Sequence, residues 1–116
     1  MFDMDHIEAE TTTCDDMEEV VMGLIINSGQ ARSLAYSALK KAKEGDMAAA
    51  RQLMTQSREA LNAAHQVQTQ LIESDQGEGK IPVTLVLVHA QDHLMTAMLA
   101  RELVTELIEL HRKLAA

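Results

Sequence analysis

The chain has 116 residues, and its 10 Lys and Arg against 18 Asp and Glu give a net charge of −8, which argues against binding to nucleic acid phosphates. Apolar residues make up 47% of the chain and aromatic residues only 2%, which predicts one small all-α domain with an aliphatic core. The single cysteine, Cys14, and the absence of a basic leader or a long apolar run predict a cytoplasmic protein with no direct membrane insertion.

Residues 1–15 are polar and unpatterned, which predicts a disordered arm ahead of one domain at 16–116. Two acidic residues, Asp15 and Asp16, favour the start of a helix, because carboxylates face free N–H groups there. Apolar residues then recur every three or four positions as far as Ala42, and Gly45 ends the helix. Asp46 caps a second helix, whose stripe of mostly small residues (Met47, Ala50, Met54, Ser57, Leu61, Ala64, Gln68, Leu71) fades near Ser74.

Residues 75–81 contain the sequence Gly-x-Gly-Lys, which invites comparison with a phosphate-binding loop. No glycine lies five residues before Gly79, and Ile81 stands where a magnesium-binding Ser or Thr belongs. We therefore expect a flexible connector. Pro82 suits the first turn of a third helix that extends to about Leu114.

Three helices of about 28–32 residues, or about 42–48 Å each, predict an antiparallel up-down-up three-helix bundle. The first half of the third helix is apolar in nearly every direction, as in Leu85, Val86, Leu87 and Val88. Such a helix should be buried on all sides, and a single three-helix bundle cannot bury it in this way. We expect self-association to bury this surface, in preference to binding of a different protein. The second half is expected to be an ordinary amphipathic helix, with an apolar face of Leu103, Val104, Leu107, Ile108 and Leu110.

One polar stripe interrupts the apolar half of this helix: His89, Asp92, His93 and Thr96 share a face at spacings of three, four and seven. The stripe points with Leu103 and Leu107, toward the core or a seam between subunits. In such a place these side chains must be paired, bound to metal or functional. A hydrogen-bonded cluster, a metal site and a reactive imidazole are the three interpretations that the spacing leaves open.

The stretch Val86-Leu87-Val88-His89-Ala90-Gln91-Asp92-His93-Leu94-Met95-Thr96 resembles the active-site signature of the lactose/cellobiose class of IIA components in the bacterial sugar phosphotransferase system. The resemblance continues in residues 18–33, 77–80 and 100–103, and it covers the chain from about Glu18 to its C-terminus.

The resemblance implies a homotrimer in which the third helices form most of the interface. It implies that His89 accepts a phosphoryl group from the phosphocarrier HPr and passes it to a cysteine of the cognate IIB component. Asp92 would meet its symmetry mates on the three-fold axis, where a divalent cation, expected to be Mg2+, is held. The process served would be uptake of a beta-linked disaccharide such as chitobiose, cellobiose or lactose, and the sequence does not identify which.

Gln91 and His93 are candidates for supporting roles beside His89. His93, one turn beyond His89, could donate a hydrogen bond to the phosphoryl group, whereas Gln91 points away from His89, toward a neighbouring helix or subunit. We expect no Arg or Lys to contact the phosphoryl group, because a relay must release its phosphate readily. The competing hypotheses are a structural helical adaptor and a metal-binding bundle that uses His89, Asp92 and His93.

Overall fold

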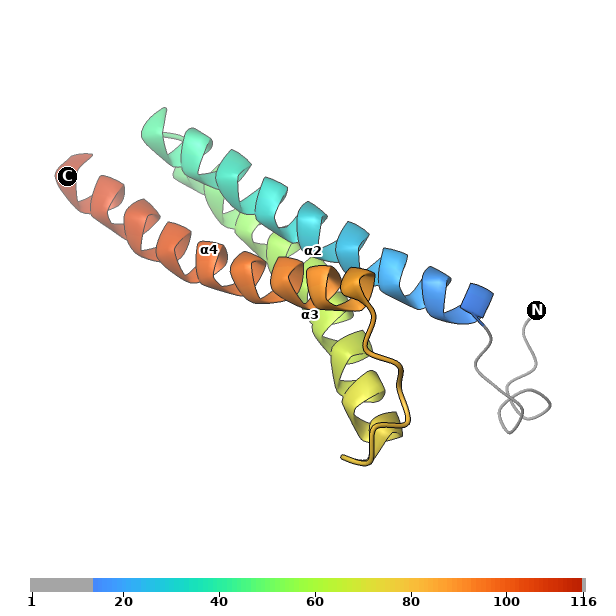
Figure 1. Cartoon of the computed structure of the whole chain (residues 1–116). Coiled ribbons are helices and arrows are strands. Elements are labelled where there is room, and N and C mark those ends of the chain that lie inside the picture. The colour runs from blue at the N-terminus through green and yellow to red at the C-terminus, as the bar shows by residue number, and fades with distance from the viewer. Residues whose placement is uncertain (1–13, 116) are drawn as a thin grey trace.

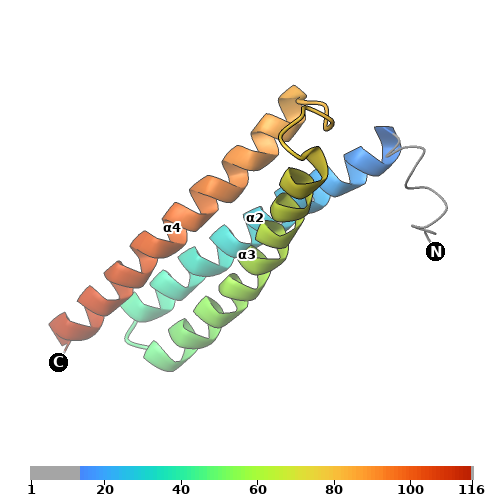
Figure 2. The same cartoon turned by 90° about the horizontal axis from the view of Figure 1, so that it is seen from below.

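The computed structural model describes residues 14–115, which form three α-helices and no strand over that range. They are α2 (Cys14–Lys43), α3 (Met47–Asp75) and α4 (Leu85–Ala115), of 30, 29 and 31 residues. The helices run up, down and up, so α2 and α4 point the same way (Figures 1 and 2). The predicted all-α bundle and the helix lengths are confirmed. The expected arm lies outside the described residues up to residue 13, and α2 already begins at Cys14.

The turn between α2 and α3 follows the residues expected to form it. Gly45 has a φ of +89°, its N–H donates to Ala42 O at 3.0 Å, and the Asp46 N–H donates to Lys41 O at 2.9 Å. This left-handed closure satisfies the last carbonyls of α2 and favours glycine. Asp46 then caps α3, since its Oδ1 accepts the Ala49 N–H at 3.1 Å.

The bundle core is built from small side chains between α2 and α3 and from larger ones toward α4. Ala31, Ala35, Ala50, Ser57 and Ala64 are fully buried, which confirms the small-residue stripe and lets α2 and α3 approach closely. The Ser57 hydroxyl donates to Ala31 O at 2.6 Å and so joins the two helices. Among the larger side chains, Leu24 of α2 and Leu94 of α4 are fully buried.

The start of α4 differs from the prediction. The helix begins at Leu85, and Pro82 lies ahead of it in an extended connection. Thr84 provides the cap, because its Oγ1 accepts the Leu87 N–H at 3.2 Å and its carbonyl accepts the Val88 N–H at 3.0 Å. A side-chain acceptor that satisfies a free N–H of the first turn therefore sets the boundary, and the proline does not.

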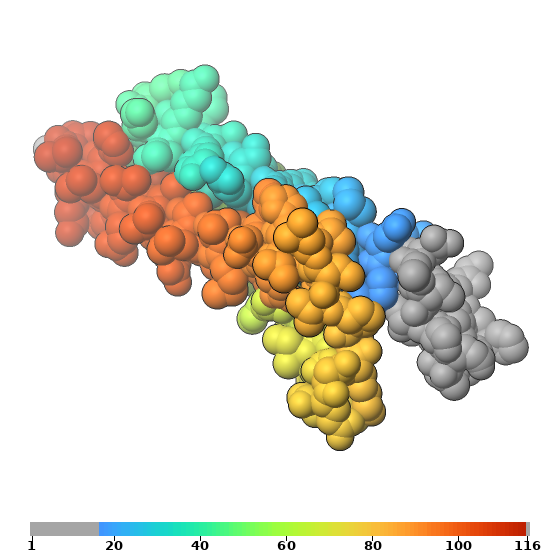
Figure 3. Space-filling view, in the orientation of Figure 1, coloured from blue at the N-terminus to red at the C-terminus, as the bar shows by residue number. Residues whose placement is uncertain are grey.

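A row of large apolar side chains on α4 faces away from α2 and α3. We call this row the outer stripe; it consists of Leu85, Val88, Met95, Leu99, Leu103, Leu107, Leu110 and Leu114, each at least 41% exposed. In Figure 3 the orange-to-red surface of α4 runs uninterrupted along the side facing the viewer. The expectation of an ordinary amphipathic second half is wrong, because Val104 turns into the core while Leu103, Leu107 and Leu110 turn outward. Helix α4 therefore has two apolar faces, and the chain covers only one.

No helix within residues 14–115 combines the length and the apolar character that a bilayer span requires.

Candidate functional site

His89 and His93 lie one turn apart on α4 and contact each other directly. Their Nε2 atoms are 3.2 Å apart, and the rings meet edge to face with centroids at 4.5 Å and an interplanar angle of 88°. His89 is exposed and His93 is half-buried. A hydrogen bond here requires one ring to donate its N–H to the lone pair of the other, so the tautomers of the two rings are complementary.

Asp92 lies on the same exposed side of α4, within the outer stripe and between Val88 and Met95. Its side chain makes no hydrogen bond or ion pair among the described residues, whereas its backbone carbonyl accepts the Thr96 hydroxyl at 2.8 Å. The sequence left two directions open for the polar stripe, toward the core or toward a seam between subunits. The core of this chain is ruled out, because Leu87, Ala90, Leu94 and Ala97 occupy that face of α4.

Gln91 points away from His89 and reaches α3, where the Gln68 side-chain amide donates to Gln91 Oε1. Its expected direction, toward a neighbouring helix, agrees with this contact. Sequence analysis did not single out Gln68 as a functional candidate, although it is a polar residue within the otherwise small and apolar stripe of α3. That interruption is the signal that could have identified it.

The histidine pair has no cationic neighbour bonded to it. Within residues 14–115, no Arg or Lys hydrogen-bonds to either ring, and every ion pair lies elsewhere. Nor do three His, Cys, Asp or Glu side chains gather as a metal site in the described part of one chain. The hypothesis of a metal site built by His89, Asp92 and His93 of a single chain therefore finds no support in this geometry.

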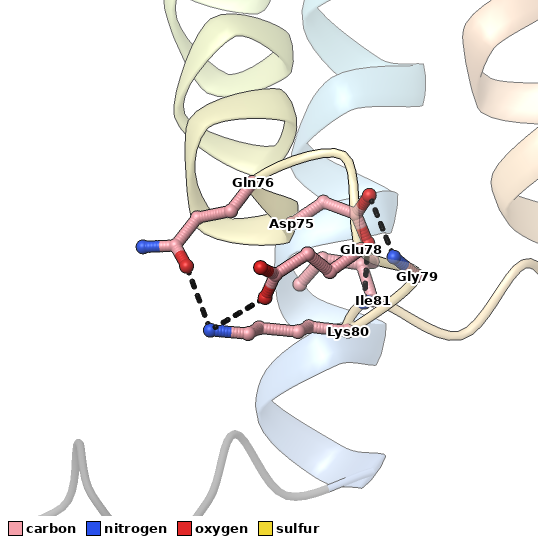
Figure 4. Close-up of polar contacts among 6 residues, drawn as sticks. All are labelled: Asp75, Gln76, Glu78, Gly79, Lys80 and Ile81. Atoms are coloured by element: carbon pink, nitrogen blue, oxygen red, sulfur yellow. Dashed lines mark hydrogen bonds and ion pairs between the residues drawn. The ribbon is translucent and has the colours of Figure 1, made fainter.

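The connection between α3 and α4 is organised, not the flexible connector that composition predicts. Asp75 Oδ1 accepts the Ile81 N–H at 2.8 Å, and Oδ2 accepts the Gly79 N–H at 3.2 Å (Figure 4). Lys80 Nζ donates to Gln76 Oε1 at 2.7 Å and lies 3.4 Å from a Glu78 carboxylate oxygen. These amides, that of Ile81 first, hold the pKa of the Asp75 carboxyl below its ordinary value of 3.8.

The histidine pair can support nucleophilic chemistry. A neutral imidazole has one nitrogen with a lone pair that can attack an electrophile. When the His93 ring donates to His89 Nε2, the His89 proton lies on Nδ1, and the Nε2 lone pair can act as a nucleophile once His93 releases it. The same N–H of His93 is then placed beside any group that becomes attached to Nε2.

Comparison with known proteins shows which family this chain resembles. The family described as "PTS system, Lactose/Cellobiose specific IIA subunit" matches residues 19–112. The chain is 72% identical over 116 residues, all of both chains, to the N,N'-diacetylchitobiose-specific EIIA component of Escherichia coli strain K12. It is 41% identical over 100 residues to the lichenan-specific phosphotransferase enzyme IIA component of Bacillus subtilis, covering 86% of this chain and 91% of that one.

Solved structures agree with this similarity. The chitobiose IIA in the solution structure of the Escherichia coli IIA–HPr complex aligns with a TM-score of 0.76 at 78% identity, over 85% of this chain and 96% of that one. The crystal structure of the cellobiose-specific enzyme IIA from Bacillus anthracis aligns with a TM-score of 0.82 at 44% identity, over 90% and 94% of the two chains.

Proposed function

The chain belongs to the lactose/cellobiose-specific IIA family of the sugar phosphotransferase system, and from this premise we propose that His89 is the residue that carries the phosphoryl group. IIA components of this system are phosphotransferase relay proteins, so the protein acts as an enzyme in a transfer sequence. The observation that carries the assignment to His89 is its exposed ring, with Nε2 beside the ring nitrogen of His93.

The donor in this proposal is HPr, since the similar chitobiose IIA forms a complex with HPr. The lone pair of His89 Nε2 attacks phosphorus, the bond from phosphorus to its donor atom on HPr breaks, and that electron pair stays with the donor atom. In the second step a cysteine thiolate of the IIB component attacks the same phosphorus, and the N–P bond returns its electrons to Nε2. His93, which reaches Nε2, donates a hydrogen bond to the phosphoryl group between the two steps.

The sugar branch is proposed from similarity alone. At 72% identity over the full chain, the N,N'-diacetylchitobiose branch is the best-supported assignment. Nothing in the bundle binds a sugar in this proposal, because sugar selectivity is assigned to the membrane IIC component and not to the carrier. The cytoplasmic location expected from the sequence is part of the same proposal.

The proposal includes a homotrimer that buries the outer stripe of α4. Along that stripe Leu85, Val88, Asp92, Met95 and Leu99 follow one another at alternating spacings of three and four, the repeat of a helical seam between chains. Leaving so many exposed leucines in water would be costly, because each buried methylene contributes about 0.8 kcal/mol. A second face of α4 that the chain does not cover supports self-association through this helix.

Asp92 is proposed to hold a divalent cation where three chains meet. A carboxylate that lacks a partner within its own chain and interrupts an apolar stripe fits this role, since three such groups on one axis would repel one another. The donor set offers only oxygens, which suits Mg2+ and not the nitrogen and sulfur sites of zinc. The cation would neutralise the carboxylates; it takes no part in the transfer at His89.

The test is incubation with phosphorylated HPr followed by intact-mass measurement. We expect one phosphate per chain for the wild type, none for His89→Ala and an unchanged yield for His65→Ala, a control in an exposed histidine of α3. Added IIB should remove the phosphate. A wild-type chain that gains no phosphate would favour the structural adaptor, and a His89→Ala chain that still gains it would refute the assignment.

A further inference from the structure

We propose that Asp75 is a positioning residue for His89, because its carboxylate binds the loop that connects α3 to the start of α4. This inference rests on the proposed role of His89 and deepens it, by naming a residue outside the signature on which the placement of the ring depends.

The loop folds its backbone around this one carboxylate. The chain turns through three positive φ angles, 55° at Gln76, 71° at Gly77 and 74° at Gly79. The amides of Gly79 and Ile81 then point at the two oxygens of Asp75, as Figure 4 shows. Successive amides around left-handed residues form a concave site for an anion. In this protein the anion is a side chain of α3, so the loop is closed onto the helix that precedes it.

The carboxylate is connected to α4 by a short and direct path. Ile81, whose amide Asp75 binds, packs against the core cluster that contains Leu24, Leu87 and Leu94. Only residues 82–84 separate Ile81 from Leu85, the first residue of α4, and the last of them, Thr84, is the cap. His89 follows Leu85 by one turn. A shift of Ile81 would therefore reach the cap and the first turn of α4, where it would change the direction of the His89 ring.

Helix α3 contributes little of the packing around this end of α4, which lies mainly against α2. Helices α3 and α4 contact each other less than either contacts α2, and Figure 1 shows the C-terminal end of α3 turning away from α4. An open cavity of about 250 Å³ lies between them, lined by Leu71, Ile81, Leu87 and Gln91 among others. Val83 is 79% exposed. The Gln68–Gln91 bond joins the two helices directly, and Asp75 adds two bonds that fix the loop leading from α3 to α4.

The experiment compares Asp75→Asn and Asp75→Ala in the full chain, with Glu73→Gln as the matched control. Glu73 lies exposed on the same turn of α3, and its substitution makes the same change of charge without touching the loop. NMR would follow amide exchange at Gly79 and Ile81 and the ring nitrogen shifts of His89. Phosphorylation by phosphorylated HPr would be resolved into kcat and KM.

We expect exchange at Ile81 to quicken about tenfold in the Asp75 variants, since a charge-assisted hydrogen bond is lost. The ring nitrogen signals of His89 should shift or broaden, and kcat should fall about three- to tenfold with KM little changed, because the nucleophile is misplaced. Glu73→Gln should resemble the wild type in every measurement.

Unchanged His89 ring signals and an unchanged kcat, in variants whose loop amides exchange faster, would overturn the proposal and leave Asp75 a purely local role. If the wild type takes no phosphoryl group, the proposed function fails, and the ring signals alone decide whether Asp75 positions His89. Should Asp75→Ala lose its helical circular dichroism, Asp75→Asn, which keeps the shape of the side chain, decides the outcome.

Discussion

His89 and His93 present the same ring atom to each other, Nε2 to Nε2, at 3.2 Å across one turn of α4. Only one proton fits between the two nitrogens, so the contact couples the tautomer of one ring to that of the other. When His93 donates, the His89 proton lies on Nδ1, and in the proposed transfer the His89 Nε2 lone pair attacks phosphorus after His93 releases it. The rings meet edge to face, with an interplanar angle of 88°. A single helical turn thus brings the proposed nucleophile beside a second imidazole.

Replacement of His93 by Ala should slow phosphoryl transfer to His89 by about 10- to 100-fold, the effect of one hydrogen bond to a charged group. The fold should survive, because His93 is only half-buried. Rapid-quench kinetics with phosphorylated HPr measures the rate, and His111→Ala, a half-buried histidine near the end of α4, is the control. A His93→Ala rate equal to the wild-type rate would remove His93 from the mechanism.

Substitution of Leu99 by Asp should break the assembly, since it places a charge in the middle of the outer stripe, where Leu99 is 54% exposed in the single chain. Sedimentation should show a particle near three times the chain mass of 12.8 kDa for the wild type and near one chain mass for the variant. Ile72→Asp, on an equally exposed apolar residue of α3, should leave the mass unchanged. An assembly that tolerates Leu99→Asp would place the interface elsewhere.

Asp92→Leu should leave a folded assembly that no longer responds to divalent cations. The substitution would remove the carboxylates that the proposed trimer brings together and would continue the outer stripe, so no repulsion would remain for a cation to offset. Thermal unfolding with Mg2+ and with a chelator should differ for the wild type and coincide for the variant. A monomeric or unfolded Asp92→Leu chain would contradict this account.

The two buried serines, Ser28 and Ser57, should respond differently to substitution. Ser57→Ala removes the hydroxyl that donates to Ala31 O, which should lower the free energy of unfolding by about 1 kcal/mol. Ser28 is also fully buried, but its hydroxyl has no partner within the described residues, so Ser28→Ala should be neutral or slightly stabilising. Urea unfolding of the two variants measures the difference, and equal losses would show that Ser28 is bonded in solution.

Acid should weaken the loop through Asp75. Its pKa is lowered in the folded chain, first by the Ile81 amide, so the ionised carboxylate stabilises the fold at pH values above its ordinary pKa of 3.8. That contribution is lost as the pH falls below 3.8 and through the lowered value. Unfolding curves at pH 6 and pH 3 should therefore differ less for Asp75→Asn than for the wild type. Identical pH dependence in the two proteins would show that the loop amides do not bind the charge.

Local signals in the sequence determine the helices. Gly45 and Asp46 end one helix and begin the next through bonds within a few residues, and an apolar spacing of three and four selects the buried positions of α2 and α3. The same spacing indicates that α4 carries more apolar surface than one bundle can cover. The resemblance of residues 86–96 to a known signature singles out His89 and Asp92, whose roles await experiment.

Tertiary structure decides what depends on contacts between distant segments. Pattern alone could not separate Val104 from Leu103, because both lie in one broad apolar band until α2 and α3 occupy a side of α4. The bond from Gln68 to Gln91 likewise depends on how α4 packs against α3, because it joins residues 23 positions apart in the sequence. Helix formation is governed by neighbours along the chain, whereas the exposure of a face and the partner of a polar group are set by what packs opposite them.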